Sequence, residues 1–184
     1  MKTVERTDII DLETYEKDRD YVRKRVMAIK APRRIHVGEH LTFLFENFET
    51  MRYQVHEMLR AEGRQGEEDI LHELETYNEL LGGPGELGCT LLIEIDDVME
   101  RARLLREWLE LPQALYAELA DVTRVRPTVD DRQSDGERLS TVQYLKFDTS
   151  GATPVALGSD LPQLTLRAEL SPDQQDALTT DLKP

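Results

Sequence analysis

The residues that could bind a metal are clustered around the four histidines of this sequence, which all fall within 37 residues. Carboxylates surround them, and imidazole together with carboxylate suits iron, manganese and zinc alike. If the polar faces of two consecutive helices packed against each other, a set of these side chains could converge. That set is Glu49, Tyr53, His56, Asp69 and His72, with Glu46 as a further ligand. The sequence therefore raises a metal-site hypothesis without selecting the metal.

The spacing of these residues matches no established metal motif. A di-iron bundle needs Glu-x-x-His, and the nearest match is Asp69-x-x-His72. A zincin needs His-Glu-x-x-His, and the pairs beginning at His56 and His72 both lack the second histidine. Helical periodicity also places His72 beside Glu68 and Glu75. A solvated helix face with pairs three and four residues apart is thus the competing interpretation.

A second polar set lies between positions 33 and 52. It consists of Arg33, Arg34, Glu46, Asn47 and Arg52. Asn47 can cap the helix that follows it, and either Arg33 or Arg34 could reach Glu46. If these side chains are buried, they must hydrogen-bond to one another. They form either a structural network or a binding site, and the structural network is favoured.

Catalytic signatures are missing from the sequence. It contains no GxSxG elbow, and the stretch GGPGELG lacks the GK[ST] ending of a phosphate loop. We therefore expect a protein that is not itself a catalyst, although the sequence does not decide the question.

Charge is distributed unevenly along the chain. The net charge is −14, yet residues 1–64 carry 13 Lys or Arg and 12 Asp or Glu. The excess acid therefore belongs to residues 65–184 and would repel phosphates, which argues against nucleic-acid binding. The basic run YVRKRVMAIKAPRR is typical of a solvated helix edge. Alternatively, it docks onto an acidic partner or onto the acidic part of a second copy, which would give a homodimer.

These residues must be positioned by helices in the first part of the chain and by strands in the second. Apolar spacing predicts helices over residues 8–31, 48–62, 67–81 and from about 97 to 109. Between the first two, residues 34–45 alternate as a hairpin, with a helix over 39–47 as the rival. TLLIEI, residues 90–95, predicts an interior strand, and further strands follow between 115 and 170 before a last helix begins at Ser171.

This order predicts an α+β fold. We expect the N-terminal helices and the short hairpin to pack on one face of a mostly antiparallel β-sheet, formed largely by the C-terminal half. The opposite face of that sheet, which carries Glu118, is expected to be solvated. Residues 1–184 are interpreted as one domain, with a mainly helical part (1–110), a β-rich part (115–170) and a short C-terminal helix or tail (171–184).

The sequence predicts a cytoplasmic location. Its charged start, MKTVERTDIIDL, is unlike a signal peptide, and no apolar run is long enough to cross a membrane. The single cysteine, Cys89, lies in an apolar stretch typical of a small core residue.

Several longer strings carry a family resemblance. RRIHVGEHLTFLFENFETMRYQVHEMLRAE, ELETYNELL, TLLIEI and RLSTVQYLKF resemble the bacterial DUF3501 family, a domain of unknown function, over roughly residues 5–170. Members of that family are often encoded beside rubrerythrin-like and iron–sulfur oxidoreductase proteins. The resemblance therefore implies an oxidative-stress or iron-linked setting, but neither iron binding by this chain nor any catalytic residue.

Together these observations predict a non-catalytic accessory or interaction protein of a cytosolic redox, iron or oxidative-stress system. Its partner would be a protein such as a rubrerythrin-like or iron–sulfur oxidoreductase. The alternative is a metal-binding protein that holds Fe, Mn or Zn through histidine and carboxylate.

Overall fold

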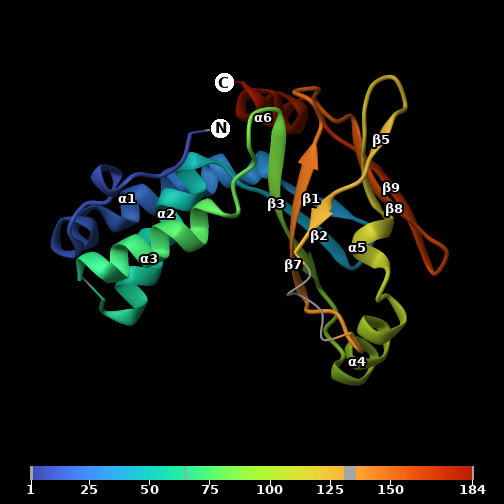
Figure 1. Cartoon of the computed structure of the whole chain (residues 1–184), viewed down its shortest axis with the longest axis horizontal. Helices are drawn as coiled ribbons and strands as arrows, with labels where there is room; N and C mark the ends of the chain where they lie inside the picture. Colours follow the sequence, from blue (N-terminus) through green and yellow to red (C-terminus); the bar gives the residue numbers. More distant parts are fainter. Residues whose placement is uncertain (1, 65, 131–135, 184) are drawn as a thin grey trace.

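The computed structural model describes residues 2–64, 66–130 and 136–183, which form a helical lobe and a strand lobe (Figure 1). The helical lobe contains η1 (Arg6–Asp8), α1 (Leu12–Lys30), α2 (Phe48–Glu62) and α3 (Glu67–Asn78). The strand lobe contains the strands together with η2 (Ala31–Arg33), α4 (Val98–Glu107), α5 (Leu111–Ala114) and α6 (Pro172–Leu182). The predicted α+β class, with N-terminal helices and a strand-rich C-terminal half, is confirmed.

Where the sequence predicts one sheet, the described residues form two antiparallel sheets. Sheet A has the order β1-β2-β3-β7-β6, and sheet B has the order β5-β4-β8-β9. The strands of sheet A are β1 (Arg34–Val37), β2 (Leu41–Phe45), β3 (Glu86–Ile93), β6 (Thr128–Val129) and β7 (Val142–Asp148). Those of sheet B are β4 (Leu115–Glu118), β5 (Arg124–Val125), β8 (Ala156–Leu161) and β9 (Leu164–Glu169). The predicted hairpin is β1–β2, and the predicted interior strand is β3.

The helix boundaries follow from local capping. The Asn47 side chain accepts a hydrogen bond from the Thr50 backbone N–H at 3.1 Å, and the Thr50 hydroxyl accepts one from the Asn47 N–H at 2.9 Å. At the other end of α2, Gly63 has a φ of +63°, a left-handed conformation that glycine adopts without strain. The predicted limits of this helix, 48 and 62, are therefore confirmed.

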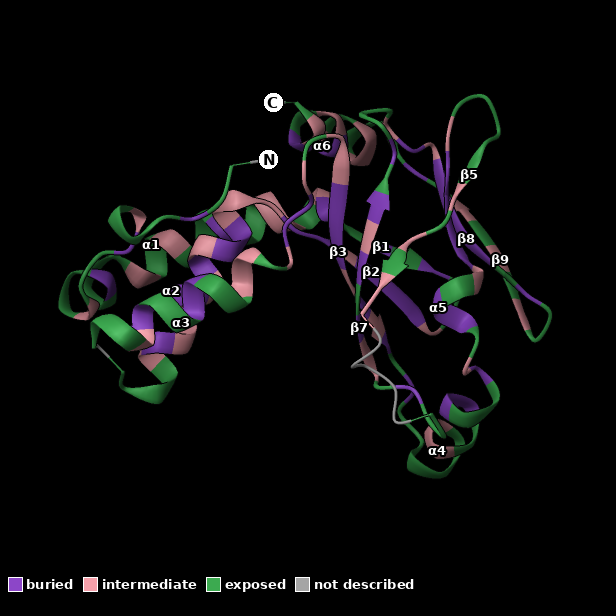
Figure 2. Cartoon of the chain, in the orientation of Figure 1, coloured by how far each residue is buried: buried purple, intermediate pink, exposed green. Residues whose placement is uncertain are grey.

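The two lobes have separate hydrophobic cores. Alternate side chains of sheet A, such as Phe43, Cys89 and Leu91, point into a core shared with sheet B, α4, α5 and α6 (Figure 2). A smaller core, built around Met51, Val55 and Leu74, joins α2, α3 and the N-terminal segment. The helices therefore lie beside sheet A and do not cover its apolar face, because sheet B occupies that face.

Three connections join the lobes: residues 30–34, 45–48 and 78–86. The third crosses β3 so closely that a Cβ placed on Gly88 would lie 2.0 Å from the Leu80 carbonyl oxygen. The angle between the lobes is thus set at a backbone crossing where only glycine fits. The single-domain interpretation stays a prediction. None of the helices in the described part of the chain combines the length and the apolar character that a membrane crossing requires.

Candidate functional site

A groove of about 880 Å³ runs between the two lobes. Its first wall comes from α3 and the turn that follows, and its second wall comes from the β6–β7 edge of sheet A. The first wall consists of His72, Glu75, Thr76, Tyr77, Glu79 and Leu80. The second includes Thr128, Val129, Asp130, Tyr144 and Lys146. A hollow of this size, with aromatic and aliphatic surface between charged groups, is suited to binding.

The sequence predicts only one residue of this groove, His72. Tyr144 and Lys146 alternate along β7 and so share a face, and that periodicity is visible in the sequence. No local pattern shows that α3 lies opposite them, because the approach is set by the crossing at Gly88 and Leu80. Tyr144 remains 39% exposed, so its ring offers apolar surface to an incoming molecule.

The structure does not assemble the predicted metal site, and His56 shows why. Its Nδ1 lies 2.8 Å from the Arg52 carbonyl oxygen and donates to it, and its Nε2 accepts a hydrogen bond from the Ile10 N–H at 3.2 Å. The ring is buried and stacks on Tyr15, with centroids 4.6 Å apart. Burial lowers the pKa of His56, which favours the neutral imidazole. Both nitrogens are engaged, so neither is available to a metal.

The other predicted ligands point in different directions. Glu49 pairs with Arg25 and Arg52, at 3.5 and 2.8 Å. Asp69 lies 4.0 Å from Arg64, while His72 lines the groove. The polar face of α2 packs against α1, where Lys30 lies 5.8 Å from the Tyr53 ring. Within residues 2–64, 66–130 and 136–183, no three His, Cys, Asp or Glu side chains are close enough to hold a metal ion.

Instead of a metal site, the polar face of α2 forms an ion-paired contact with α1. Arg19 donates two hydrogen bonds of 2.8 Å to the Glu57 carboxylate, and the Tyr15 hydroxyl donates a third at 2.7 Å. The bonds from Arg19 are the main reason that the pKa of Glu57 falls to about 2. The cluster therefore holds the helical lobe together in its charged state.

Of the second predicted polar set, the structure joins only Arg33 and Asn47, and it does so through a carboxylate that the prediction did not include. Arg33 donates to Asp181 of α6 at 2.7 and 2.9 Å rather than to Glu46. Asn47 donates to the same carboxylate at 3.1 Å. Arg34 instead lies 3.7 Å from Glu94, and Arg52 pairs with Glu49 on its own helix, as described above. The network ties α6 to the start of the hairpin and the start of α2.

Glu46 is buried at the point where β2 leads into α2. Its carboxyl accepts hydrogen bonds from the Thr50 hydroxyl at 2.6 Å and the Thr90 hydroxyl at 3.3 Å. Burial raises the pKa of Glu46, an effect that these hydroxyls and the charge of Lys30 offset only in part. Thr90 is the register partner of Tyr144, so this carboxyl lies one strand away from the groove.

We expect Glu46→Gln to be at least as stable as the natural chain at pH 7. A carboxyl whose pKa is raised by folding favours the folded state most below its unfolded value of 4.5, and that contribution is lost as the pH rises through the folded pKa. The amide removes this loss, so stability should fall less between pH 4 and pH 7. Urea unfolding at both pH values, with the exposed Glu13→Gln as control, tests the expectation. A variant that is less stable at pH 7 but not at pH 4 would show that the carboxylate is the favoured form.

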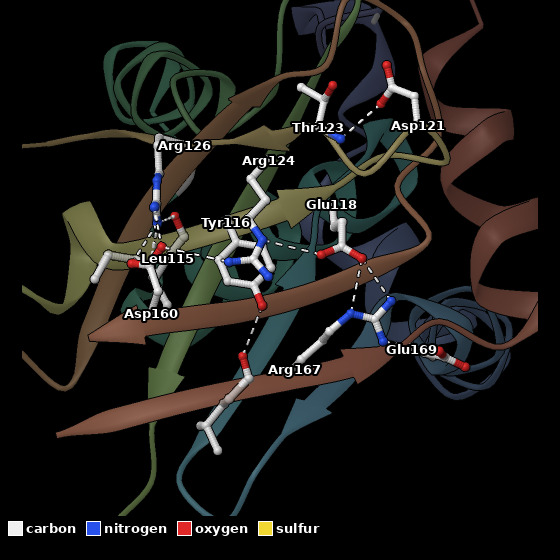
Figure 3. Close-up of polar contacts among 12 residues, drawn as sticks. Leu115, Tyr116, Glu118, Asp121, Thr123, Arg124, Arg126, Asp160, Arg167 and Glu169 are labelled. Carbon is white, nitrogen blue, oxygen red and sulfur yellow. Dashed lines mark hydrogen bonds and ion pairs between the residues drawn. The ribbon is translucent and has the colours of Figure 1, made fainter. Parts of the chain in front are cut away.

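A third polar cluster covers the outer face of sheet B (Figure 3). Glu118 accepts hydrogen bonds from Arg167 at 2.8 and 3.0 Å and from Arg124 at 3.3 Å. The bonds from Arg167 contribute most to the lowered pKa of Glu118. Arg124 lies 4.1 Å from the Tyr116 ring centroid, and Arg126 binds Asp160. Each arginine has a carboxylate partner, so this cluster stabilises the sheet and leaves no arginine unpaired.

The expectation that Glu118 lies on a solvated face is therefore wrong. The side chain points to the outer side of the sheet, as its position in the strand requires, but only 6% of the residue is exposed. Arg124 and Arg167, which come from the two strands β5 and β9, lie over it. Alternation along a strand assigns a face, but it does not show which long side chains cover that face.

Comparison with known proteins identifies relatives for almost the whole chain. No curated protein matches it. A crystal structure of a novel protein of unknown function from Burkholderia pseudomallei K96243 is similar, with 30% sequence identity and a TM-score of 0.89. The match covers 99% of this chain and 100% of that one. Residues 3–182 also match the family model described as "Protein of unknown function (DUF3501)". The chain therefore belongs to the DUF3501 family.

Proposed function

We propose that this protein is a non-catalytic interaction protein that binds a partner protein in the groove between α3 and the β6–β7 edge. The observation that carries the proposal is the groove itself, which places the exposed Tyr144 between charged walls that come from different lobes. Protein-binding surfaces combine aromatic anchors with a polar rim in this way. His56, the one buried histidine, has both ring nitrogens engaged in hydrogen bonds.

The biological setting is part of the same proposal. The family resemblance implies a redox, iron-handling or oxidative-stress system, with a rubrerythrin-like or iron–sulfur oxidoreductase protein as the partner. A cytosolic location fits the buried, unpaired thiol of Cys89, because reduced thiols persist in that compartment. Burial raises the pKa of Cys89 well above its ordinary value, so the thiol is kept in its unreactive form.

Filling the groove should abolish partner binding. Thr76 is exposed on α3 and lines the groove, so Thr76→Trp places a large ring there without disturbing the core. Ala28→Trp, on the exposed side of α1, is the matched control. We expect proteins recovered from the native cytosol by the natural chain to be recovered equally by Ala28→Trp and lost with Thr76→Trp, as measured by quantitative mass spectrometry. Recovery unaffected by Thr76→Trp would exclude the groove as the binding site.

A further inference from the structure

We infer that the occupant of this groove is a short basic protein segment that carries an apolar side chain, an inference that rests on the proposed function. The inference depends on the charge of α3, on exposed apolar residues of α3 and β7, and on two α3 carboxylates, Glu68 and Glu75, that take part in no ion pair. Each is a property of described residues.

The α3 wall is strongly acidic. From Glu67 to Glu79 the chain has six Asp or Glu and no Lys or Arg. Glu67 is held by Arg6 at 2.9 Å, and Asp69 lies 4.0 Å from Arg64. Glu68 and Glu75 take part in no ion pair or side-chain hydrogen bond in the described part of the chain. Their exposed carboxylates are available to cations of a binding partner.

The balance of charge inside the groove has the same sign. Among the described residues of its lining, the carboxylates of Glu75, Glu79 and Asp130 outnumber the ammonium of Lys146 and the imidazole of His72. The net charge of the chain from residue 65 onward is also negative, because residues 65–184 carry 25 Asp or Glu and 10 Lys or Arg. A nucleic acid or an anionic metabolite would be repelled, whereas a basic segment would be steered toward the groove.

Apolar surface lies within this acidic field. Leu71 is 50% exposed on α3, one turn before Glu75 and one turn after Glu68. Tyr144, on the β6–β7 wall of the groove, provides a second exposed side chain with apolar surface. Charge alone would attract any cation, but exposed aliphatic and aromatic surface flanked by carboxylates favours a segment that alternates Lys or Arg with Leu or an aromatic residue.

A second copy of this chain is the rival occupant, because α1 carries exposed Tyr21 beside Lys24 and Arg25. However, α1 packs on α2, and α2 in turn packs on α3, so α1 and α3 flank the lobe on opposite sides of α2 (Figure 1). Contacts of α1 with α3 of another copy would then be head-to-tail and would give rings or open chains rather than a two-fold dimer. The geometry therefore favours a different protein.

The inference is tested with defined peptides and paired charge variants of the full chain. The probe is a fluorescent peptide of about twelve residues, alternating Lys and Leu, with a Glu and Leu peptide for comparison. Glu68→Gln with Glu75→Gln, the groove pair, removes two charges from α3, one in the groove lining and one two turns before it. Asp18→Asn with Asp20→Asn removes two charges from exposed positions of α1. Fluorescence anisotropy gives the Kd at about 50 mM and about 500 mM salt, a range over which the screening length falls severalfold.

We expect the basic peptide to bind, the acidic peptide not to bind, and the groove pair to weaken binding about five- to tenfold. The α1 pair should leave the Kd within about twofold, and high salt should weaken binding to the natural chain. Equal weakening by both pairs, or equal binding of both peptides, would overturn the inference. So would concentration-dependent self-association in sedimentation that the groove pair abolishes. If Thr76→Trp removes the native partner while the basic peptide fails, the proposed function stands and only the basic occupant is wrong.

Discussion

Asp181→Ala is expected to lower the free energy of unfolding by about 3–5 kcal/mol, the range observed when one member of a buried ion pair is removed. The Arg33 side chain is only 9% exposed, and Asp181 supplies the carboxylate that neutralises it. Without Asp181, the guanidinium keeps its hydrogen bonds to the carbonyls of Ile29 and Ala177 but loses its counter-charge. Asn47 loses a partner at the same time, so the start of α2 is loosened as well.

Urea denaturation of the natural chain and of Asp176→Ala provides the comparison. Asp176 is exposed on the same helix, so its replacement by alanine changes helix propensity equally and should cost less than about 0.5 kcal/mol. Combining Asp181→Leu with Arg33→Met should recover part of the loss, because no buried charge then remains without a partner. If Asp181→Ala and Asp176→Ala were equally stable, the pair would not be buried as the structure shows.

Gly88→Ala should destabilise the protein by about 3 kcal/mol or more, since overpacking against backbone cannot be relieved by a change of rotamer. The new methyl would lie 2.0 Å from the Leu80 carbonyl oxygen and 2.9 Å from the Gly82 nitrogen. Both atoms belong to the connection between α3 and β3. Relieving the clash moves α3 away from sheet A, so the groove should widen as well.

The control for this substitution is Gly63→Ala. Gly63 has a positive φ, but a Cβ added to it would meet no atom within 4 Å, so alanine there should cost only about 1 kcal/mol. Thermal and urea unfolding report the stability difference, and small-angle X-ray scattering reports the angle between the lobes. Equal effects of the two substitutions would mean that the crossing at Gly88 does not fix the lobes.

Local features of this fold are predictable because they depend on residues close in sequence. The α2 helix has the predicted limits because Asn47 caps its start and Gly63 ends it. The hairpin is predictable because Ile35, Val37, Leu41, Phe43 and Phe45 alternate, and an α-helix would place these side chains on several faces. In both cases, the residues that determine the local structure lie within the element or next to it in the sequence.

Partner choices between distant elements are not predictable in this way. Periodicity correctly places His56 on the polar side of α2, but it does not reveal that α1, rather than α3, packs against that side. Arg33 pairs with Asp181, which is 148 positions away, although Glu46 is nearer in sequence. The groove is equally unpredictable from the sequence, because its two walls are far apart in the chain. They are brought together where the chain crosses β3 at Gly88.

The central claim is that the groove between α3 and the β6–β7 edge binds a partner protein, and site-specific photocrosslinking in living cells tests it most directly. Benzoylphenylalanine replaces His72 at the groove, leaving Thr76 unchanged, or Ala28 on α1, and both replaced residues are exposed. The structure predicts a discrete protein adduct from position 72, with crosslinked peptides of this chain restricted to the groove, and no such adduct from position 28. An adduct from position 28 alone, or adducts of equal yield from both positions, would contradict the claim.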